Sequence, residues 1–277
     1  MHALSPVELA RRLVRRRRSP PAGPDPSADA VQFRCNVCGA HNRVDPARIA
    51  RESTSCGRCL STVRFRAMAY LAVRETLGIE AALPDLSPRR DISGIGLSDD
   101  RRYARRLARI FDYQNTYLHK SPRLDITDVP PARRGRYDFA IVSDVFEHVE
   151  PPVSRAFEGA RSLLKPGGVL VFSVPFTLEA ETVEHFPELC HWSLRKRDGA
   201  WRLTNVTADG RTETFHDLVF HGGPGSTLEM RRFSRAALER HFAAAGFARM
   251  RIADEPCAQF GIRWPEPWCV PMVAYAE

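Results

Sequence analysis

An apolar strand, a helix and a second apolar strand follow one another between Tyr137 and Val174, and this succession constrains the fold of the 277-residue chain most. We predict the first strand over 137–145 (YDFAIVSDV), the helix over 153–164 and the second strand over 169–174 (VLVFSV). Strands that are apolar on both faces are typical of parallel sheets covered by helices on both sides. The succession therefore predicts an α/β fold with a parallel sheet.

The same alternation continues on both sides of this unit. Before it, we expect a helix over 62–77 that ends at Gly78, and a strand from Asp91 followed by a helix capped by Ser98. After residue 233, we expect a helix capped by Ser234. The other expected strands are weak ones at 115–119 and 123–127 and two late ones at 249–253 and 270–276.

Four of the seven cysteines form two closely spaced pairs. Cys35 and Cys38 enclose two residues, as do Cys56 and Cys59, and 17 residues separate the pairs. Such pairs direct their sulfurs to one point, and four thiolates suit tetrahedral Zn²⁺. Four sulfur ligands leave no open position, so we expect structural rather than catalytic zinc. A redox-active or disulfide-linked pair is the alternative.

These patterns divide the chain into parts. We expect a flexible basic arm and linker over 1–30, a zinc ribbon over 31–66 and a larger α/β domain over 67–277. An insertion at 176–233 interrupts that domain, covers the carboxyl edge of its sheet and contains a hairpin near Asp209-Gly210. The odd number of remaining cysteines favours free thiols, and no stretch has the length of a membrane span, so we expect a cytoplasmic protein.

The chain is basic, with a formal net charge of +8. A basic balance favours acidic partners, nucleic acid among them. The basic residues are scattered, however, and the interleaving of basic and aromatic residues that marks a stacking groove is missing from the sequence.

Residues 137–176 resemble the class I S-adenosylmethionine-dependent methyltransferases of bacterial type. The likeness lies in Glu147-His148-Val149 after the apolar strand, in LKPGG at 164–168 and in the late helix and strand over 233–252. The cysteine segment followed by STVRFRAMAYL is similar to the zinc-ribbon leader of some members. The resemblance implies a doubly wound, mostly parallel seven-stranded sheet (the Rossmann-like methyltransferase fold) with a small N-terminal zinc ribbon. The cofactor is then expected at the carboxyl ends of the first strands.

The resemblance also suggests the contacts of S-adenosylmethionine. The glycine-rich loop of the family is degenerate here, and its nearest match runs over 91–99. This match is either the first strand with its loop, which we favour because a helix follows, or the end of the second strand. Asp125 matches the adenine-contacting acid, with a turn-capping role as the alternative. The candidate cofactor residues are Ser93, Gly94, Gly96, Ser98, Asp125, Ile126, Ser143 and Asp144.

Methyl transfer depends mainly on alignment of the acceptor with the methyl group, and a base is needed only when the acceptor must lose a proton. Segment 221–231 (HGGPGSTLEMR) is unusual, because its glycines permit close backbone approach and Glu229 and Arg231 add a charged clamp. A tight structural loop is the alternative. The candidate catalytic bases are Asp144, His148 and His221, with His185 in addition.

The sequence thus predicts an S-adenosylmethionine-dependent methyltransferase with structural zinc, acting on a small-molecule or saccharide acceptor, or on RNA. Two alternatives are a catalytically inactive scaffold of the same fold and a zinc-ribbon nucleic-acid adaptor, because fold alone does not establish function. No membrane partner is expected, and the oligomeric state is left open.

Overall fold

The computed structural model describes residues 29–277, so all but the last two residues of the expected arm lie outside it. Its centre is a six-stranded sheet in the order β15-β16-β6-β5-β3-β4. The four strands from β6 to β4 are parallel, whereas β16 runs antiparallel to both β6 and β15. The strands are β3 (Arg89–Leu97), β4 (Phe111–Thr116), β5 (Tyr137–Ser143), β6 (Leu164–Ser173), β15 (Arg249–Ile252) and β16 (Met272–Tyr275).

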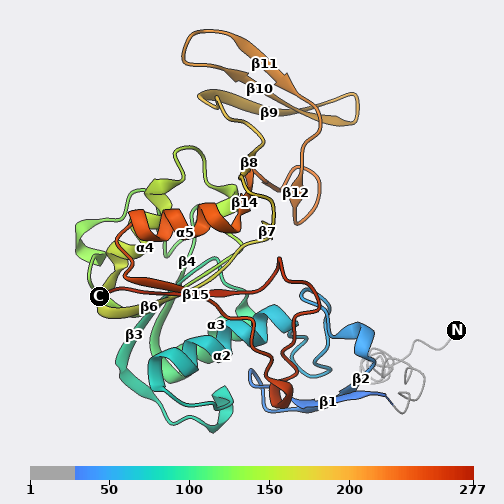
Figure 1. The fold of residues 1–277 in the computed structure, drawn as a ribbon, viewed down its shortest axis with the longest axis vertical. Helices are drawn as coiled ribbons and strands as arrows, with labels where there is room; N and C mark the ends of the chain where they lie inside the picture. The colour runs from blue at the N-terminus through green and yellow to red at the C-terminus, as the bar shows by residue number, and fades with distance from the viewer. Residues whose placement is uncertain (1–28) are drawn as a thin grey trace, which may run out of the picture.

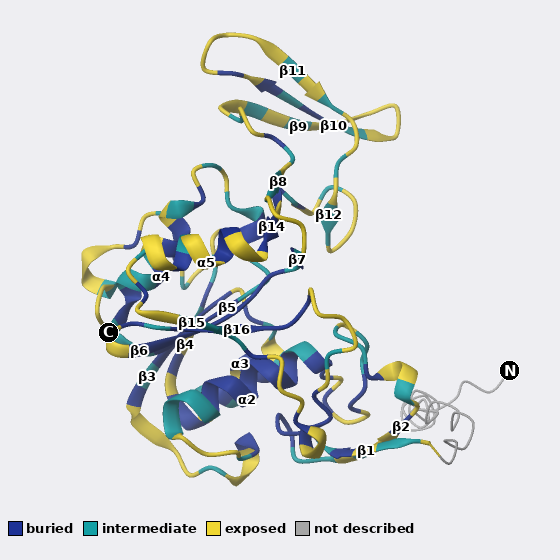
Figure 2. Ribbon diagram, in the orientation of Figure 1, coloured by how far each residue is buried: buried dark blue, intermediate teal, exposed yellow. Residues whose placement is uncertain are grey.

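Helices cover both faces of this sheet (Figure 1). One face carries α2 (Val63–Leu77) and α3 (Arg101–Ile110), and the other carries α4 (Ser154–Leu163) and α5 (Arg235–Ala244). The central strands β5 and β6 are buried over most of their length, as the dark ribbon in Figure 2 shows. Two apolar clusters, one on each face, form the core. The predicted α/β architecture is therefore confirmed.

Several helix ends follow the sequence signals. Gly78 takes the left-handed conformation that ends α2, and Ser234 caps α5 by accepting a hydrogen bond from the Ala237 amide. The predicted cap at Ser98 is wrong. The cap of α3 is Asp100, whose carboxylate accepts from the Arg102 amide, while Ser98 has a positive φ of 58° in the preceding turn.

The sheet has six strands in the described residues, not the seven expected. The weak strand expected at 123–127 is reduced to one bridge between Tyr117 and Arg123. The Asp125 carboxylate accepts hydrogen bonds from the amide and hydroxyl of Thr127 and so closes a turn. A residue that turns the chain in this way cannot continue a ladder of backbone hydrogen bonds, and the edge strand does not form.

The cysteine-containing segment lies against the face of the sheet that carries α2. It begins with a hairpin of β1 (Val31–Arg34) and β2 (His41–Val44). Its buried residues, such as Phe33 and Ile49, belong to the same apolar cluster as Phe139 and Val171 of the sheet. We call residues 31–62, up to the cap of α2, the leader.

The insertion leaves the sheet at the carboxyl end of β6. Its largest part is an antiparallel sheet of β9 (His191–Arg197), β10 (Ala200–Val206) and β11 (Thr212–Phe215), which projects from the α/β body in Figure 1. Gly210, with φ of 87°, lies in the β10–β11 turn, so the hairpin expected there is confirmed. The chain returns through β12 (Phe220–His221), β13 (Thr227–Leu228) and β14 (Arg231–Ser234), and β14 lies between β7 (Phe176–Thr177) and β8 (Val183–Glu184).

Candidate active site

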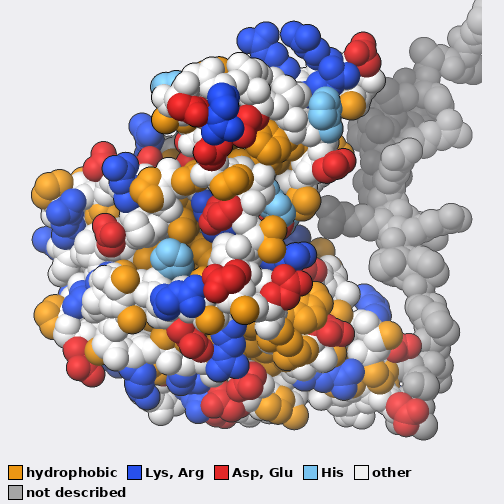
Figure 3. All heavy atoms as spheres, turned by 45° about the horizontal axis from the view of Figure 1, so that its top comes forward, with side chains coloured by type: hydrophobic (Ala, Val, Ile, Leu, Met, Phe, Trp, Pro, Cys, Tyr) orange, Lys and Arg blue, Asp and Glu red, His pale blue; other side chains and the backbone are white. Residues whose placement is uncertain are grey.

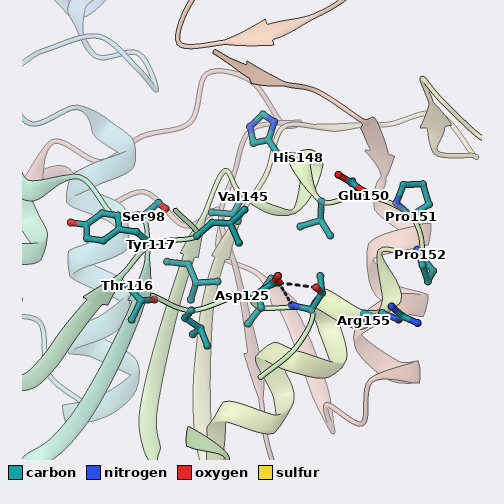
Figure 4. Close-up of a pocket in the computed structure, with 16 residues that line it drawn as sticks. Ser98, Thr116, Tyr117, Asp125, Val145, His148, Glu150, Pro151, Pro152 and Arg155 are labelled. Carbon is teal, nitrogen blue, oxygen red and sulfur yellow. Dashed lines mark hydrogen bonds between the residues drawn. The ribbon is translucent and has the colours of Figure 1, made fainter. Parts of the chain in front are cut away.

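A pocket of about 380 Å³ lies at the carboxyl ends of β3, β4 and β5. In an open α/β sheet this is the edge at which ligands bind. Of the candidate residues, Ser98, Asp125, Ile126 and His148 line it (Figure 4). Its other lining residues are Leu97, Thr116, Tyr117, Leu118, Leu124, Thr127, Val145, Val149, Glu150, Pro151, Pro152 and Arg155.

The chemistry of this lining fits an adenosine-containing ligand. Leu97 and Ile126 supply apolar surface, and Asp125 supplies a carboxylate. Only one Asp125 oxygen, Oδ1, accepts the two hydrogen bonds from Thr127 at 2.9 and 2.7 Å (Figure 4). The expected turn-capping role is thus present, and Oδ2 has no hydrogen bond to protein among the described residues. Arg155 adds a cation to the same lining.

The glycines of the degenerate loop are not in the pocket, and this expectation needs correcting. Gly94 and Gly96 lie inside β3, the central strand that the favoured register requires. A Cβ on Gly94 would lie 2.2 Å from the Phe139 ring, and one on Gly96 would lie 2.0 Å from the Asp99 carboxylate and the Tyr113 hydroxyl. The space that these glycines leave is filled by the protein's own side chains, not by a cofactor-sized opening.

Asp99 dominates the turn that follows β3. Its buried carboxylate accepts hydrogen bonds from the hydroxyls of Tyr103, at 2.6 Å, and Tyr113. Burial raises the pKa of Asp99 to about 7, although the two hydroxyls and the charge of Arg64 act against burial. The backbone amides are occupied as well, since Ser98 donates to the Thr116 carbonyl.

Ser93 lies in β3 just before its pairing with β5 begins, and it does not line the pocket. Its expected role as a cofactor contact therefore needs correcting. Its amide and hydroxyl both donate to the Asp138 carboxylate at 2.8 Å. Lys165 donates to the same carboxylate at 2.7 Å. These bonds join β3, β5 and the start of β6, so Ser93 stabilises the sheet.

Asp144 and Ser143 do not line the pocket but face Arg51 of the leader and Arg64 of α2, against their predicted roles in cofactor binding and catalysis. The Asp144 carboxylate accepts from Arg51 at 2.5 and 2.9 Å and lies 3.3 Å from Arg64. Arg64 donates to the Ser143 hydroxyl at 2.8 Å. Burial works to raise the pKa of Asp144, but the two guanidinium charges outweigh it and lower the pKa. A carboxylate held in this way is a poor base.

His148, from the turn after β5, and His221, from β12 of the insertion, come together with a buried carboxylate. Oε1 of Glu147 lies 3.7 Å from Nε2 of His148 and 3.8 Å from Nδ1 of His221. Glu147 is 1% exposed, and neither of its carboxylate oxygens has a hydrogen-bond partner among the described residues. Burial and the nearby Asp144 charge raise the pKa of Glu147. We call Glu147, His148 and His221 the histidine cluster.

Each histidine of the cluster is oriented by a bond to its other nitrogen. Nδ1 of His148 lies 2.8 Å from the Leu228 carbonyl oxygen and donates to it. Nε2 of His221 donates to Glu229 at 2.7 Å, and His185 donates to the other oxygen of Glu229 at 2.8 Å. Burial works to raise the pKa of Glu229, but these two bonds outweigh it and lower the pKa to about 2. Burial lowers the pKa of His148.

Arg231 of segment 221–231 binds the protein's own backbone and is not free to clamp a ligand. The Arg231 side chain is 1% exposed and donates to the carbonyls of Phe146 and Val149 at 3.1 and 2.6 Å. Gly225 has a positive φ, and a Cβ there would lie 2.1 Å from the Trp201 ring. The alternative of a tight structural loop describes this part best.

The four leader cysteines also converge. Sγ of Cys35 lies 3.7 Å from Sγ of Cys59, and Sγ of Cys38 lies 3.6 Å from Sγ of Cys56. Bonds of about 2.3 Å to a tetrahedral Zn²⁺ separate the sulfurs by about 3.8 Å. All four sulfurs lie within 4.8 Å of one another, so the set fits zinc and excludes a disulfide in this geometry.

Sequence reasoning missed the buried, unpartnered carboxylate of Glu147 and the two arginines that hold Asp144. The EHV motif contains Glu147, but no periodicity shows that its carboxylate is buried without a partner. Arg51 and Arg64 lie 93 and 79 positions from their partners Asp144 and Ser143, a distance over which one sequence gives no contact signal. His221 was a candidate, and its closeness to His148 required the insertion to fold back.

The charged surface is mixed over most of the face in Figure 3, where acidic and basic side chains alternate. Basic side chains gather at the far end of the insertion, where β9 ends in Arg195-Lys196-Arg197. Among the described helices, none combines the length and apolar character needed to cross a bilayer.

A helix-covered parallel sheet with a pocket at its carboxyl edge defines an α/β ligand-binding protein of the nucleotide-cofactor type. The sequence model of the family described as methyltransferase domain matches residues 90–250, more than half of the chain. The chain therefore belongs to the class I S-adenosylmethionine-dependent methyltransferase family. No curated protein matches it.

Solved structures with a similar fold are distant. An S-adenosylmethionine-dependent methyltransferase from Clostridium acetobutylicum ATCC 824 is 13% identical, with 76% of this chain and 90% of that chain covered and a TM-score of 0.43. The 1,6-didemethyltoxoflavin-N1-methyltransferase of Burkholderia thailandensis is 14% identical, with 76% and 77% covered and a TM-score of 0.40. An amino pentose methyltransferase from Micromonospora echinaspora is 14% identical, with 76% and 90% covered and a TM-score of 0.40. These likenesses are weak, and the family assignment rests on the family model.

Proposed function

We propose that the protein binds S-adenosylmethionine in the pocket and transfers its methyl group to a small-molecule or saccharide acceptor. The observation that carries the proposal is the position of the pocket at the carboxyl ends of β3, β4 and β5 in a chain of this family. In the proposal Asp125 accepts a hydrogen bond from the exocyclic amine of adenine through its open oxygen. Leu97 and Ile126 pack against the adenosine, and Arg155 meets the methionine carboxylate.

The cofactor supplies a methyl group on a sulfonium, which is already activated for in-line displacement. The chain has to align the acceptor and exclude water. His148 connects the pocket with the histidine cluster, so the acceptor is proposed to enter between the pocket and segment 221–231. His148 and His221 are proposed to act on the acceptor side of the site, whereas Asp144 is assigned to the contact with Arg51.

A small acceptor is favoured over RNA. The basic end of β9 lies at the far end of the insertion, and the face in Figure 3 has no continuous basic surface leading from it to the body. The leader cysteines are proposed to hold structural Zn²⁺, because four sulfur ligands complete a tetrahedral site and all four cysteines are buried.

Calorimetry with S-adenosylmethionine and S-adenosylhomocysteine tests the proposal. Asp125→Ala is expected to weaken binding about 10–100-fold, since a hydrogen bond to a charged group contributes about 1.5–3 kcal/mol. Asp112→Ala on the exposed side of β4 is the matched control and should bind like the wild type. No heat with either compound would reject the proposal and leave the inactive scaffold, whereas steeply salt-dependent RNA binding would support the adaptor.

A further inference from the structure

The histidine cluster has the features of a coordination site rather than of a hydrogen-bonded core. Its three ligand atoms, one each from Glu147, His148 and His221, lie within 4.8 Å of one another. Bonds of about 2.0–2.2 Å in a tetrahedral site separate oxygen and nitrogen ligands by about 3.4 Å. The distances of 3.7 and 3.8 Å from Glu147 Oε1 are only a few tenths of an ångström wider.

Glu147 supplies the observation that points to a cation. A buried carboxylate is normally hydrogen-bonded or paired with a charge, because desolvation of an unpaired carboxylate is costly. Glu147 is 1% exposed and has no hydrogen-bond partner for either oxygen. Arg51 acts on it only through its field, and that arginine is already bound to Asp144. The two imidazole nitrogens lie 3.7 and 3.8 Å from Glu147 Oε1.

The tautomers leave both nitrogens ready to bind a metal. Because His148 donates through Nδ1 to the Leu228 carbonyl, its Nε2 carries a lone pair in the neutral ring. Because His221 donates through Nε2 to Glu229, its Nδ1 carries one too. Both lone-pair atoms face Glu147. A carbonyl or carboxylate behind each ligating histidine is the arrangement that fixes metal-bound imidazoles elsewhere.

We propose that Glu147, His148 and His221 bind a divalent transition-metal ion of the zinc type at the edge of the pocket. Two imidazoles and one carboxylate suit such ions, and three protein ligands leave a coordination position open. His148 also lines the pocket, so the three residues would hold the ion at the border of the pocket. This centre is separate from the four-cysteine centre, which has no open position.

A role for the ion rests on the proposed function. With Glu147, His148 and His221 holding the ion, it would lower the pKa of an acceptor hydroxyl, whose proton would pass to water. The oxygen lone pair then forms the bond to the methyl carbon, and the electrons of the carbon–sulfur bond return to sulfur, so that the sulfonium becomes a thioether. The metal is not consumed, and no oxidant or reductant is needed. We therefore propose that the acceptor carries a hydroxyl group.

Metal content tests the site without reference to activity. Tag-free protein is incubated with excess Zn²⁺, freed of unbound metal and analysed for zinc per chain. The wild type is expected to hold about two equivalents, and Glu147→Gln about one, because the amide keeps the shape and removes the charge. His216→Gln, an exposed histidine in the same insertion, is the control and should keep both.

Further variants protect the test against misfolding. His221→Gln should also lose one equivalent, and Glu229→Gln, a positioning residue, should weaken the affinity for the second zinc about 10–100-fold. A wild type that holds only one equivalent, or Glu147→Gln and His221→Gln variants that keep two, would overturn the site. Calorimetry with S-adenosylhomocysteine on the same samples distinguishes failure of the metal site from failure of the proposed function. Protein that holds two zinc ions but does not bind S-adenosylhomocysteine would reject the proposed function and leave the metal site intact.

Discussion

The leader and the insertion are both additions to the α/β body, but they are joined to it in different ways. Buried leader residues such as Phe33 and Val37 belong to the cluster that also contains Phe139 and Ile141 of β5. Within the insertion, Phe186, Leu203, Leu228 and Met230 form a separate small cluster, and only Phe176 and Phe233 at its two ends join the core cluster on the α4–α5 face. The leader is therefore part of the main core, whereas the insertion has a core of its own.

Their contacts with the loop after β5 differ as well. The leader reaches it with charge, through Arg51 on Asp144. The insertion reaches it through hydrogen bonds to backbone, such as Met230 to the Glu147 carbonyl at 2.8 Å. Regions with few shared apolar contacts open at lower free energy than the core. We therefore expect the leader to contribute to the stability of the whole protein and the insertion to open locally.

The largest effect is expected from the leader cysteines. Cys56→Ser should release metal and unfold the leader, and the shared core should transmit the loss to the whole protein. Thermal unfolding and zinc content measure both effects. Cys190→Ser in the insertion is the control, because Cys190 is exposed and lies outside the cluster. A Cys56→Ser protein with its full metal content would contradict the zinc assignment.

A smaller loss is expected where the leader meets the sheet. Asp144→Asn leaves Arg51 and Arg64 with only the half-exposed Glu52 as a charged partner, and removal of one partner of a buried pair costs up to about 3–5 kcal/mol. Asp85→Asn breaks the exposed pair with Arg34 and should cost less than about 1 kcal/mol. Urea unfolding compares the two variants, and equal losses would mean that the leader contact is no more buried than a surface pair.

The insertion should respond locally to the loss of a core side chain. Leu203→Ala removes a buried side chain of the small cluster, which costs about 2–5 kcal/mol at the site. Hydrogen exchange should accelerate over 186–230 while the global unfolding midpoint moves little. Met68→Ala, the matched truncation in α2, should lower the global midpoint instead. A global loss for Leu203→Ala would show that the insertion and the body unfold as one unit.

The sequence predicted the elements of this comparison better than their contacts. Apolar periodicity over 137–174 predicted β5, α4 and β6, and the C-x2-C spacing predicted the convergence of Cys35, Cys38, Cys56 and Cys59. These signals are local, because each depends on neighbours within a helix turn, a strand or a tight loop.

The candidate site was predicted only in part, because its contacts are long-range. Ser98 and Asp125 line the pocket as expected, whereas Gly94 and Gly96 are packing glycines of β3. A glycine that packs inside a strand and a glycine that lines a ligand pocket look alike in a sequence. Only the side chains opposite them, such as Phe139 and Tyr113, show that the space is filled. The pairing of His148 with His221 likewise depends on how the insertion returns to the body.

The smallest expected effect is a pH dependence on the leader side of the sheet. Asp99 lies close to α2. Its carboxylate accepts a hydrogen bond from the Tyr103 hydroxyl, and the Tyr103 ring packs against Phe65 of α2. Burial raises the pKa of Asp99 from 3.8 to about 7, and the hydroxyls of Tyr103 and Tyr113 and the charge of Arg64 only partly oppose it. Between these values the folded state binds more protons than the unfolded state.

The sign of the effect follows from this difference in bound protons. The contribution of Asp99 to stability is fully present below the unfolded pKa and is lost as the pH rises towards 7, at up to about 1.4 kcal/mol per pH unit. Asp99→Asn keeps a neutral hydrogen-bonding group and removes the titration. The free energy of unfolding of the variant should therefore rise relative to that of the wild type as the pH goes from 5 to 7, roughly the upper part of the range between the two pKa values. Urea unfolding across that range measures the difference, in which the other titrating groups cancel. Parallel stability curves for the two proteins would mean that Asp99 is ionised in the folded state over this whole pH range. The buried environment of Asp99 near α2 would then tolerate a negative charge, contrary to the prediction.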